Sequence, residues 1–303
     1  SGLPSAPAIA QMQRTGRAHA ERSWMAPDAA KADLLYVSDF ETNDVYAFSF
    51  PEGKLVGKLS GILKHFVYPA GLCADKSGNV YVPDSANANV LEYAHGGTKP
   101  LRTLSDPDEY PYSCAVDPVT GDLAVVNLES VSGAGGISLY KHAAGHPVKF
   151  NYGFVYKFYF DAYDAKGNLF VDASYQVPSQ PFTFMELPHD AKSLRAITLN
   201  NDFAIGGGVA WDGAHVDVAD SSVSKVYSFS IPRKTGKLAG TTPLQTCRFV
   251  TQFFVADKTI VAASFHGKSV LFWKYPAGGA PVKRIGGFGE PFGVTLSRAA
   301  SHT

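Results

Sequence analysis

The chain has few residues with which to cross-link itself or hold a metal. Three cysteines among 303 residues are too few for a disulfide framework, and they do not have the spacing of a zinc motif. The nine histidines form no HExxH pair, and no Gly-x-Ser-x-Gly elbow marks a nucleophilic serine. No catalytic motif is therefore visible in the chain.

An excess of one charge and long apolar runs are also missing. Lys plus Arg and Asp plus Glu both number 27, so no overall field attracts nucleic acid or an acidic membrane. No apolar stretch approaches the roughly 18 residues needed to span a bilayer, and no segment has a helical period. We expect a monomer with no nucleic-acid partner and no transmembrane segment.

What the chain does contain is a repeat of about 45 residues. Tyr36-Val37-Ser38-Asp39 lies 45 positions before Tyr81-Val82-Pro83-Asp84. The last residue of the second strand of each unit recurs at steps of 43 to 47, at Asp39, Asp84, Asn127, Ala173, Asp220 and Ser264. Each unit is interpreted as four short strands bounded by Gly, Asp, Asn and Pro. In the second unit these strands are residues 71–75, 79–84, 90–93 and 100–104, and tight turns between first and second strands are expected at 76–79 and 165–168. The pattern predicts an all-β, six-bladed β-propeller of four-stranded blades over residues 33–303.

The two ends of the repeat indicate how the ring closes. The first unit begins directly at its second strand, residues 34–37, and residues 290–297 have the form of a first strand with no blade after it. We expect the C-terminal strand to complete the first blade. Residues 1–32 lie outside the repeat and are rich in Ala, Pro and polar residues, so we interpret them as a leader or tether of a secreted, periplasmic or cell-surface protein.

The sequence leaves open whether two of the cysteines form a disulfide. Cys73 and Cys114 fall on first strands of adjacent units, two and three residues before Asp75 and Asp117. That offset turns their side chains to opposite faces of their strands, which favours buried free thiols and leaves a disulfide as the alternative. Cys247 is unpaired under either interpretation.

The repeat resembles the NHL type of six-bladed propeller and its YVTN relatives. The likeness rests on Pro69-Ala70-Gly71 up to Asp75, on Gly78-Asn79-Val80-Tyr81-Val82-Pro83-Asp84, and on Val90 to Tyr93. This superfamily includes lactonases, lyases and binding modules. Gluconolactonase relatives hold a divalent ion through a Glu before a first strand; Glu290 resembles it, and Asp161 and Gln252 occupy inner-strand starts. Their Asn ligands have no counterpart here, where Ser113 and Gly207 stand instead.

Ligands of such propellers meet the central channel at one face. The ends of second strands place Asp39, Asp84, Asn127, Asp172 and Asp220 there, and aromatic residues lie on or near the loops entering first strands: Tyr68, Tyr110, Tyr112, Tyr156, Tyr159, Phe203, Phe254 and Phe292. Carboxylates around an aromatic rim suit a cation or a sugar. Each Asp also suits a turn-capping role, because it recurs in most units.

Two functions remain open. The favoured one is a non-catalytic module without a cofactor that binds a small molecule, glycan or protein through the aromatic face, with Asp84 and Asn127. The alternative is a metal-dependent hydrolase or lyase in which Glu290 and Asp161 are the catalytic candidates. These two residues and Gln252 would be its calcium or zinc ligands. An axis filled by apolar side chains would count against both.

Overall fold

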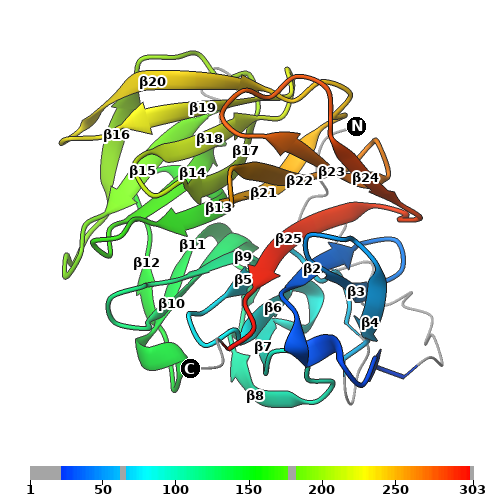
Figure 1. Ribbon diagram of the computed structural model, residues 1–303. Coiled ribbons are helices and arrows are strands. Elements are labelled where there is room, and N and C mark those ends of the chain that lie inside the picture. The colour runs from blue at the N-terminus through cyan, green and yellow to red at the C-terminus, as the bar shows by residue number, and fades with distance from the viewer. Residues whose placement is uncertain (1–21, 62–65, 177–181, 301–303) are drawn as a thin grey trace.

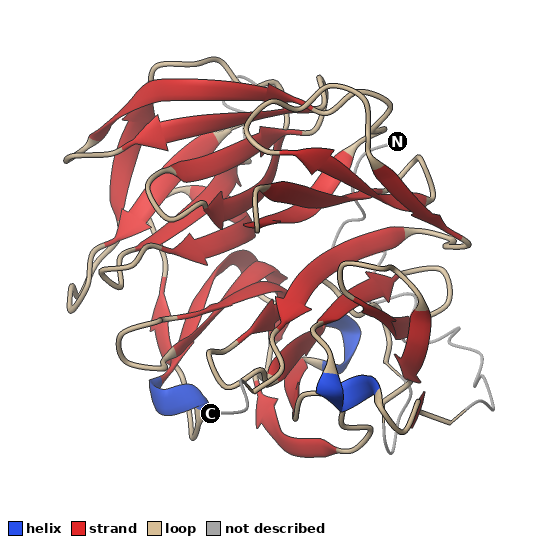
Figure 2. Ribbon diagram, in the orientation of Figure 1, coloured by secondary structure: helices blue, strands red, loops and turns tan. Residues whose placement is uncertain are grey.

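Antiparallel strands arranged around a central axis make up the protein, as the computed structural model shows for residues 22–61, 66–176 and 182–300 (Figures 1 and 2). The fold is a β-propeller. The helical elements of the described residues are three short 3-10 turns: η1 (Ala29–Lys31), η2 (Ser85–Asn87) and η3 (Lys141–Ala143). No helix in this part of the chain is long and apolar enough to cross a membrane.

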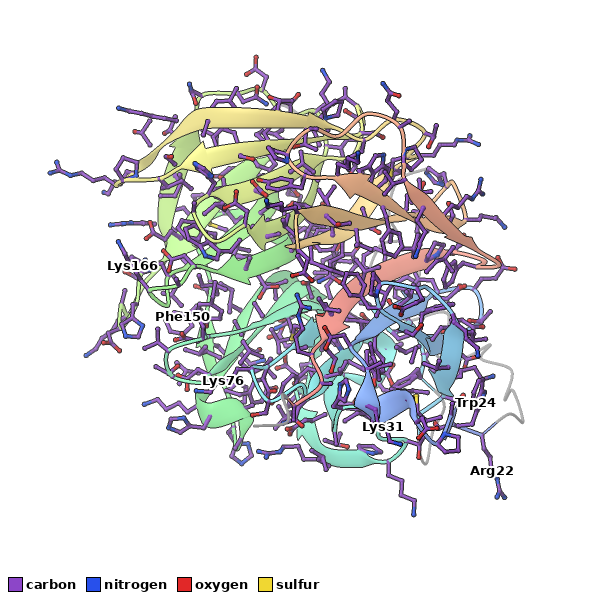
Figure 3. The ribbon with its side chains drawn as sticks, viewed as in Figure 1. Arg22, Trp24, Lys31, Lys76, Phe150 and Lys166 are labelled. Atoms are coloured by element: carbon purple, nitrogen blue, oxygen red, sulfur yellow. A yellow bond between two sulfur atoms is a disulfide. The ribbon has the colours of Figure 1, made fainter. Side chains whose placement is uncertain are left out.

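The first sheet joins the two ends of the repeat. Its strand order is β1 (Trp24–Met25), β4 (Leu55–Leu59), β3 (Asp44–Ser49), β2 (Leu34–Asp39) and β25 (Pro291–Ser297). β25 runs antiparallel to β2 with Leu34 opposite Ser297, so the predicted pairing of the C-terminal strand with the first unit is confirmed. β1 lies on the outer edge against β4, where Trp24 is exposed (Figure 3). The rest of the expected tether, residues 1–21, lies outside the described residues.

The other sheets follow the chain in order. Three have four strands: β5 (Cys73–Ala74), β6 (Val80–Asp84), β7 (Asn89–Tyr93) and β8 (Pro100–Ser105); β9 (Glu109–Val116), β10 (Leu123–Ser130), β11 (Gly133–Tyr140) and β12 (Val148–Phe150); and β21 (Val250–Ala256), β22 (Thr259–Ser264), β23 (Ser269–Lys274) and β24 (Lys283–Gly286).

One sheet has eight strands. Its first four are β13 (Val155–Tyr163), β14 (Leu169–Tyr175), β15 (Thr183–Leu187) and β16 (Arg195–Leu199), and its others are β17 (Gly206–Trp211), β18 (Val216–Asp220), β19 (Lys225–Ser230) and β20 (Thr235–Pro243). A short parallel contact between β16 and β20 joins the two groups.

Tight turns connect the first and second strands where the sequence predicts them. Asp75 Oδ1 accepts hydrogen bonds from the backbone N–H groups of Ser77 and Asn79. Gly78 has a φ of +83° in this turn, a conformation that glycine adopts without steric cost. Asp164 forms the equivalent turn with Lys166 and Asn168.

The innermost strands surround the axis. They are neighbours in the order β25, β5, β9, β13, β17 and β21, and β21 contacts β25 again. Serine hydroxyls link adjacent sheets: Ser38 Oγ donates to Ala70 O over 2.7 Å, and Ser221 Oγ donates to Val250 O over 2.5 Å. The apolar cores lie between neighbouring sheets and at the axis. The ring is therefore held together by both packing and polar contacts.

Candidate functional site

The aspartates at the ends of second strands hold the loops that enter the inner strands. Asp39 accepts hydrogen bonds from the N–H groups of Gly289 and Glu290, and Asp84 Oδ1 accepts one from Val67 N at 2.8 Å. Asp172 and Asp220 do the same for Phe160 and Ala204. The amide of Asn127 donates to Ser138 Oγ. These contacts support the turn-capping interpretation for the set.

Five rings form an axial aromatic cluster: Phe40, Tyr68, Tyr112, Phe160 and Phe292. Phe40 stacks on Tyr68 with a centroid separation of 3.6 Å and on Phe292 with one of 4.1 Å. Tyr112 and Phe160 complete the group at 5.0 and 5.6 Å from Phe292. All five are buried.

This burial corrects the expectation that Tyr68, Tyr112 and Phe292 face a ligand. Tyr112, Phe160 and Phe292 occupy the same repeat position on converging inner strands, so each ring meets the others instead of water. Burying a ring of this size stabilises the fold by about 1.5–3 kcal/mol. The cluster fills the axis at this level and acts as packing.

Polar atoms are nevertheless trapped beside these rings. Tyr68 Oη, Tyr112 Oη and Asp172 Oδ2 are buried, with no hydrogen-bond partner in the part of the chain that the structure describes. Burial raises the pKa of Tyr112 and Asp172 well above their ordinary values. Burial therefore favours the protonated, neutral form of both groups.

One residue further along the inner strands, three strands carry polar side chains and three carry glycine. Ser113, Asp161 and Gln252 share this repeat position with Gly71, Gly208 and Gly293. Ser113 Oγ donates to Asp161 Oδ1 over 2.8 Å, and burial raises the pKa of Asp161 to about 8. A Cβ at Gly71 would lie 3.1 Å from Ser113 Cβ and Oγ, so this glycine leaves room for the serine side chain.

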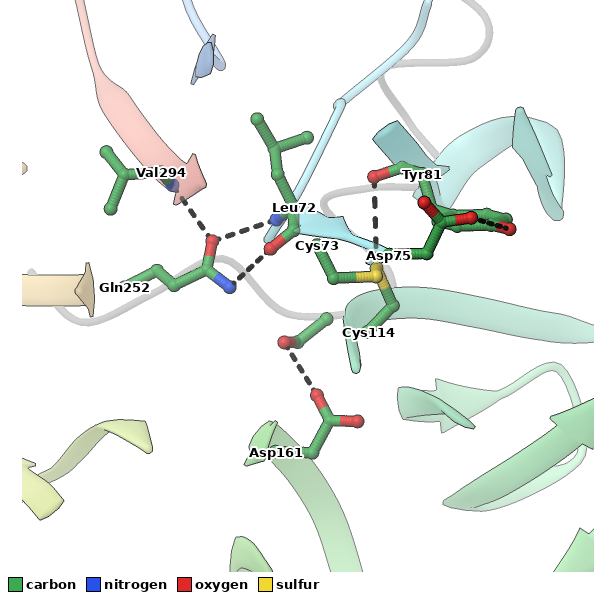
Figure 4. The surroundings of a disulfide bond; sticks show 9 residues. Leu72, Cys73, Asp75, Tyr81, Cys114, Asp161, Gln252 and Val294 are labelled. Carbon is green, nitrogen blue, oxygen red and sulfur yellow. Dashed lines mark hydrogen bonds between the residues drawn. A yellow bond between two sulfur atoms is a disulfide. The ribbon is translucent and has the colours of Figure 1, made fainter. Parts of the chain in front are cut away.

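Among these polar side chains, Gln252 is the one that hydrogen-bonds to the backbone of two other chain segments. Its Oε1 accepts hydrogen bonds from Leu72 N and Val294 N, at 2.8 and 2.9 Å, and its Nε2 donates to Leu72 O (Figure 4). The amide therefore links β21 to β25 and to the residue that precedes β5. Both of its polar atoms are used by this bridge.

The candidate metal ligands do not fit a metal site. The side-chain amide of Gln252 is hydrogen-bonded to backbone groups, and the carboxylate of Asp161 accepts a hydrogen bond from Ser113. Glu290 is half-buried, and its backbone N–H donates to Asp39. Burial raises the pKa of Glu290. The negative charges of Glu41 and Asp39 raise this pKa further, and the charges of Lys268 and His266 lower it. Among the described residues no three His, Cys, Asp or Glu side chains are arranged to hold an ion.

The other predicted aromatics do not form one surface. Tyr110 and Tyr159 are partly buried against the axial aromatic cluster, and Tyr159 Oη lies 3.1 Å from Ser174 Oγ. Tyr156 is half-buried in β13. Phe254 belongs to a different core, where its ring lies 6.2 Å from that of Phe50. The predicted rim is thus divided between packing positions and a few half-buried rings.

The cysteines are bonded, contrary to the favoured interpretation. Cys73 and Cys114 form a disulfide between β5 and β9 with a Cα separation of 5.5 Å (Figure 4). In a ring of sheets, one face of each sheet packs against the opposite face of its neighbour. Side chains on opposite faces are therefore the ones that meet. Cys247 is unpaired, as predicted, and it is buried.

Sequence reasoning missed the exposed apolar residues of the loop face. We use this name for the end of the ring formed by the loops after second strands and those entering inner strands. Phe154 is 91% exposed there, with Val131, Val223 and Ile205 at 67%, 50% and 43%. Val131 lies between two serines and Val223 follows two more, a turn context that signals exposure.

Two hollows lie away from the axis. One of about 550 Å³ opens on the loop face at the last sheet; we call it the basic hollow, and its polar lining is Thr246, Arg248, His266, Lys268, Ser269 and Arg284. The other, of about 250 Å³, lies between the third sheet and its neighbour at the opposite end, with Asp117, Phe150, Tyr163 and His189 among its walls.

Comparison with known proteins shows the fold alone. No family model and no curated protein matches the chain. A nidogen/laminin complex contains a similar structure with a TM-score of 0.69 at 11% identity, covering 88% of this chain and 99% of that one. A Bacteroides caccae protein of unknown function matches with 0.65 at 14%, over 88% and 99%. A streptogramin B lyase matches with 0.54 at 12%, over 85% and 74%. The neighbours are β-propellers, and they include both binding and enzymatic proteins.

Proposed function

We propose that this protein is a non-catalytic binding propeller that engages a protein partner through its loop face. The observation that carries the proposal is the 91% exposure of Phe154, together with the exposed Val131, Ile205 and Val223 on loops of the same end of the ring. Large exposed apolar side chains at one end of a molecule favour an interaction site there. The filled axis counts against a ligand at the axial aromatic face, so the binding surface proposed here is the loop face instead.

We infer in addition that the ring has six blades of the NHL type. The eight-stranded sheet divides at its short parallel contact into two antiparallel groups of four. Six inner strands then follow one another around the axis. The repeat period of 43 to 47 residues supports the same count.

We also propose a secreted, periplasmic or cell-surface location. The bond between Cys73 and Cys114 supports it, because disulfides persist in oxidising compartments and are rare in the cytosol. A tether at residues 1–32 remains part of this proposal.

The test compares two double variants on opposite ends of the ring. Val131→Ser with Phe154→Ser alters the loop face, and Val119→Ser with Val282→Ser is the matched control, since both valines are exposed, at 54% and 58%, in turns outside the loop face. Immobilised wild type and both variants are exposed to the extracytoplasmic protein fraction of the source cells. Retained proteins are compared by quantitative mass spectrometry.

The expected partner is retained by wild type and control and is lost on the loop-face variant. The purified partner should then bind the loop-face variant at least about tenfold more weakly, since truncating one interface anchor costs about 1–2 kcal/mol or more. A partner that binds all three proteins equally would contradict the proposal.

A further inference from the structure

The basic hollow combines volume with charge of one sign. Arg248, His266, Lys268 and Arg284 line a space of about 550 Å³, and no carboxylate is among the lining residues. The chain as a whole has equal numbers of acidic and basic residues. A local excess of cationic side chains around one hollow is therefore a feature of this site and not of the composition.

The backbone around the hollow is tightly organised. Arg248 N donates to Ser264 Oγ over 2.8 Å, and His266 N donates to Arg248 O over 3.0 Å. A Cβ at Gly267 would come within 2.2 Å of Ser264 Oγ, so this position of the turn has no room for a side chain. The loop that carries Arg248 and the turn that carries Lys268 are thereby fixed relative to each other.

Protein counter-charges occupy only one side of the hollow. Lys268 Nζ lies 3.6 Å from Glu41 Oε2, and both side chains are largely exposed. The charges of Lys268 and His266 also act on Glu290. In the described part of the chain no carboxylate lies within ion-pair distance of Arg248 or Arg284, and Arg284 donates only to Gly267 O, over 3.3 Å.

We propose that the basic hollow binds a tetrahedral oxyanion, the phosphate or sulfate group of a small ester. The planar guanidinium groups of Arg248 and Arg284 offer paired N–H donors that match such a group, and Lys268 adds a point charge. Leu271 and Pro281 also line the hollow and provide an apolar wall for the organic part of the ligand. This site does not depend on the protein partner proposed above.

Isothermal titration calorimetry tests the site with glucose 6-phosphate, glucose 6-sulfate, inorganic phosphate and sulfate, and glucose as the uncharged comparison. The variant combines Arg248→Gln with Arg284→Gln. The control combines Arg233→Gln with Lys234→Gln, two exposed cations of the turn between β19 and β20. Both variants change the net charge equally, and all four side chains are exposed, so folding is unaffected.

We expect one anion per chain to bind the wild type and the control, with affinity at least about tenfold lower in the Arg248 and Arg284 variant. The preference between the two esters identifies a phosphate or a sulfate source. Absence of binding up to about 10 mM, a concentration that would nearly saturate a site with a Kd of about 1 mM, overturns the proposal. Equal binding to both double variants overturns it as well, because the charge would then act without the hollow.

Discussion

The side-chain amide of Gln252 forms two hydrogen bonds with the backbone of Leu72, which lies 180 residues earlier in the chain. The same Oε1 also accepts Val294 N from the closing strand. One buried side chain thus satisfies three backbone groups that face the axis. No other described side chain spans β21, β25 and the second sheet in this way.

Replacing Gln252 with Leu should destabilise the ring strongly. Two N–H groups and one carbonyl lose their partners in a buried place, and each unsatisfied group costs about 1–3 kcal/mol. We expect the free energy of unfolding to fall by roughly 3–5 kcal/mol in urea titrations. Gln245→Leu is the control, since that residue is exposed. Equal losses in the two variants would mean that the bridge does not matter.

Reduction of the disulfide should also lower stability. Cys73 and Cys114 enclose a separation of 41 residues, for which loop-closure entropy predicts about 4 kcal/mol. Cys73→Ser with Cys114→Ser should therefore melt several degrees below wild type in a thermal scan. Reductant should lower the wild-type Tm and leave that of the double variant unchanged. If reductant lowered the Tm of both proteins equally, its effect would not come from the bond between Cys73 and Cys114.

Two buried tyrosines should respond oppositely to loss of their hydroxyl groups. Tyr140 Oη donates to Ser105 O over 2.9 Å, whereas Tyr112 Oη has no partner in the described part of the chain. Tyr140→Phe should cost about 1 kcal/mol of unfolding free energy. Tyr112→Phe should leave that energy unchanged or raise it, since it removes an unsatisfied polar atom. A clear loss for Tyr112→Phe would indicate that water or a ligand bonds that hydroxyl.

Stability should fall as the pH rises from about 4 to about 8. Burial raises the pKa of Asp161 to about 8 and those of Asp84 and Asp217 to about 7, whereas an unfolded aspartate titrates near 4. Between these values the folded chain binds more protons than the unfolded one, so the contribution is full at low pH and lost as pH rises. Measurements of Tm at pH 5 and pH 8 test this order.

Asp161→Asn isolates one of these groups. The amide oxygen still accepts from Ser113, and nothing remains to titrate. The variant should be more stable than wild type at pH 8 and show a smaller difference at pH 5. Asp190→Asn, at an exposed aspartate, should follow the wild-type profile. A profile of Asp161→Asn parallel to that of wild type would exclude Asp161 as a source of the pH dependence.

Ending the chain after residue 288 should open the ring. The truncation removes the whole of β25, which pairs with β2 from Leu34 to Asp39 and contributes Phe292 to the axial aromatic cluster. We expect the cooperative melting transition to be lost or moved far below that of a chain ending at residue 300. An unchanged Tm would refute the role of β25 in closure.

The repeat period predicts strands well because turn chemistry is local. The second and third strands of the second unit, predicted at residues 79–84 and 90–93, are observed at Val80–Asp84 and Asn89–Tyr93. The closing strand, predicted at 290–297, is observed at Pro291–Ser297. The first strand of that unit, predicted at 71–75, is reduced to Cys73–Ala74, since the chain before it bonds across the axis to Gln252.

The site was harder to predict, because it depends on how several strands converge. The repeat shows that Tyr112 and Phe292 point toward the axis, but the space left there depends on the residues of the other inner strands. Gly71 leaves room for the side chain of Ser113, and large rings fill the axis at the adjacent repeat position. The disulfide was not predicted for a similar reason. Its formation depends on how two neighbouring sheets pack, which the pattern of a single strand does not show.

The pairing of Leu34 with Ser297 also has a consequence for biosynthesis. A ribosome releases β2 long before β25, so the inner edge of β2 has no native neighbour until β25 has also emerged. Contacts this distant in sequence form slowly. An interrupted translation product therefore displays a bare strand edge, a natural point of recognition for chaperones and proteases and a place where two incomplete chains can pair.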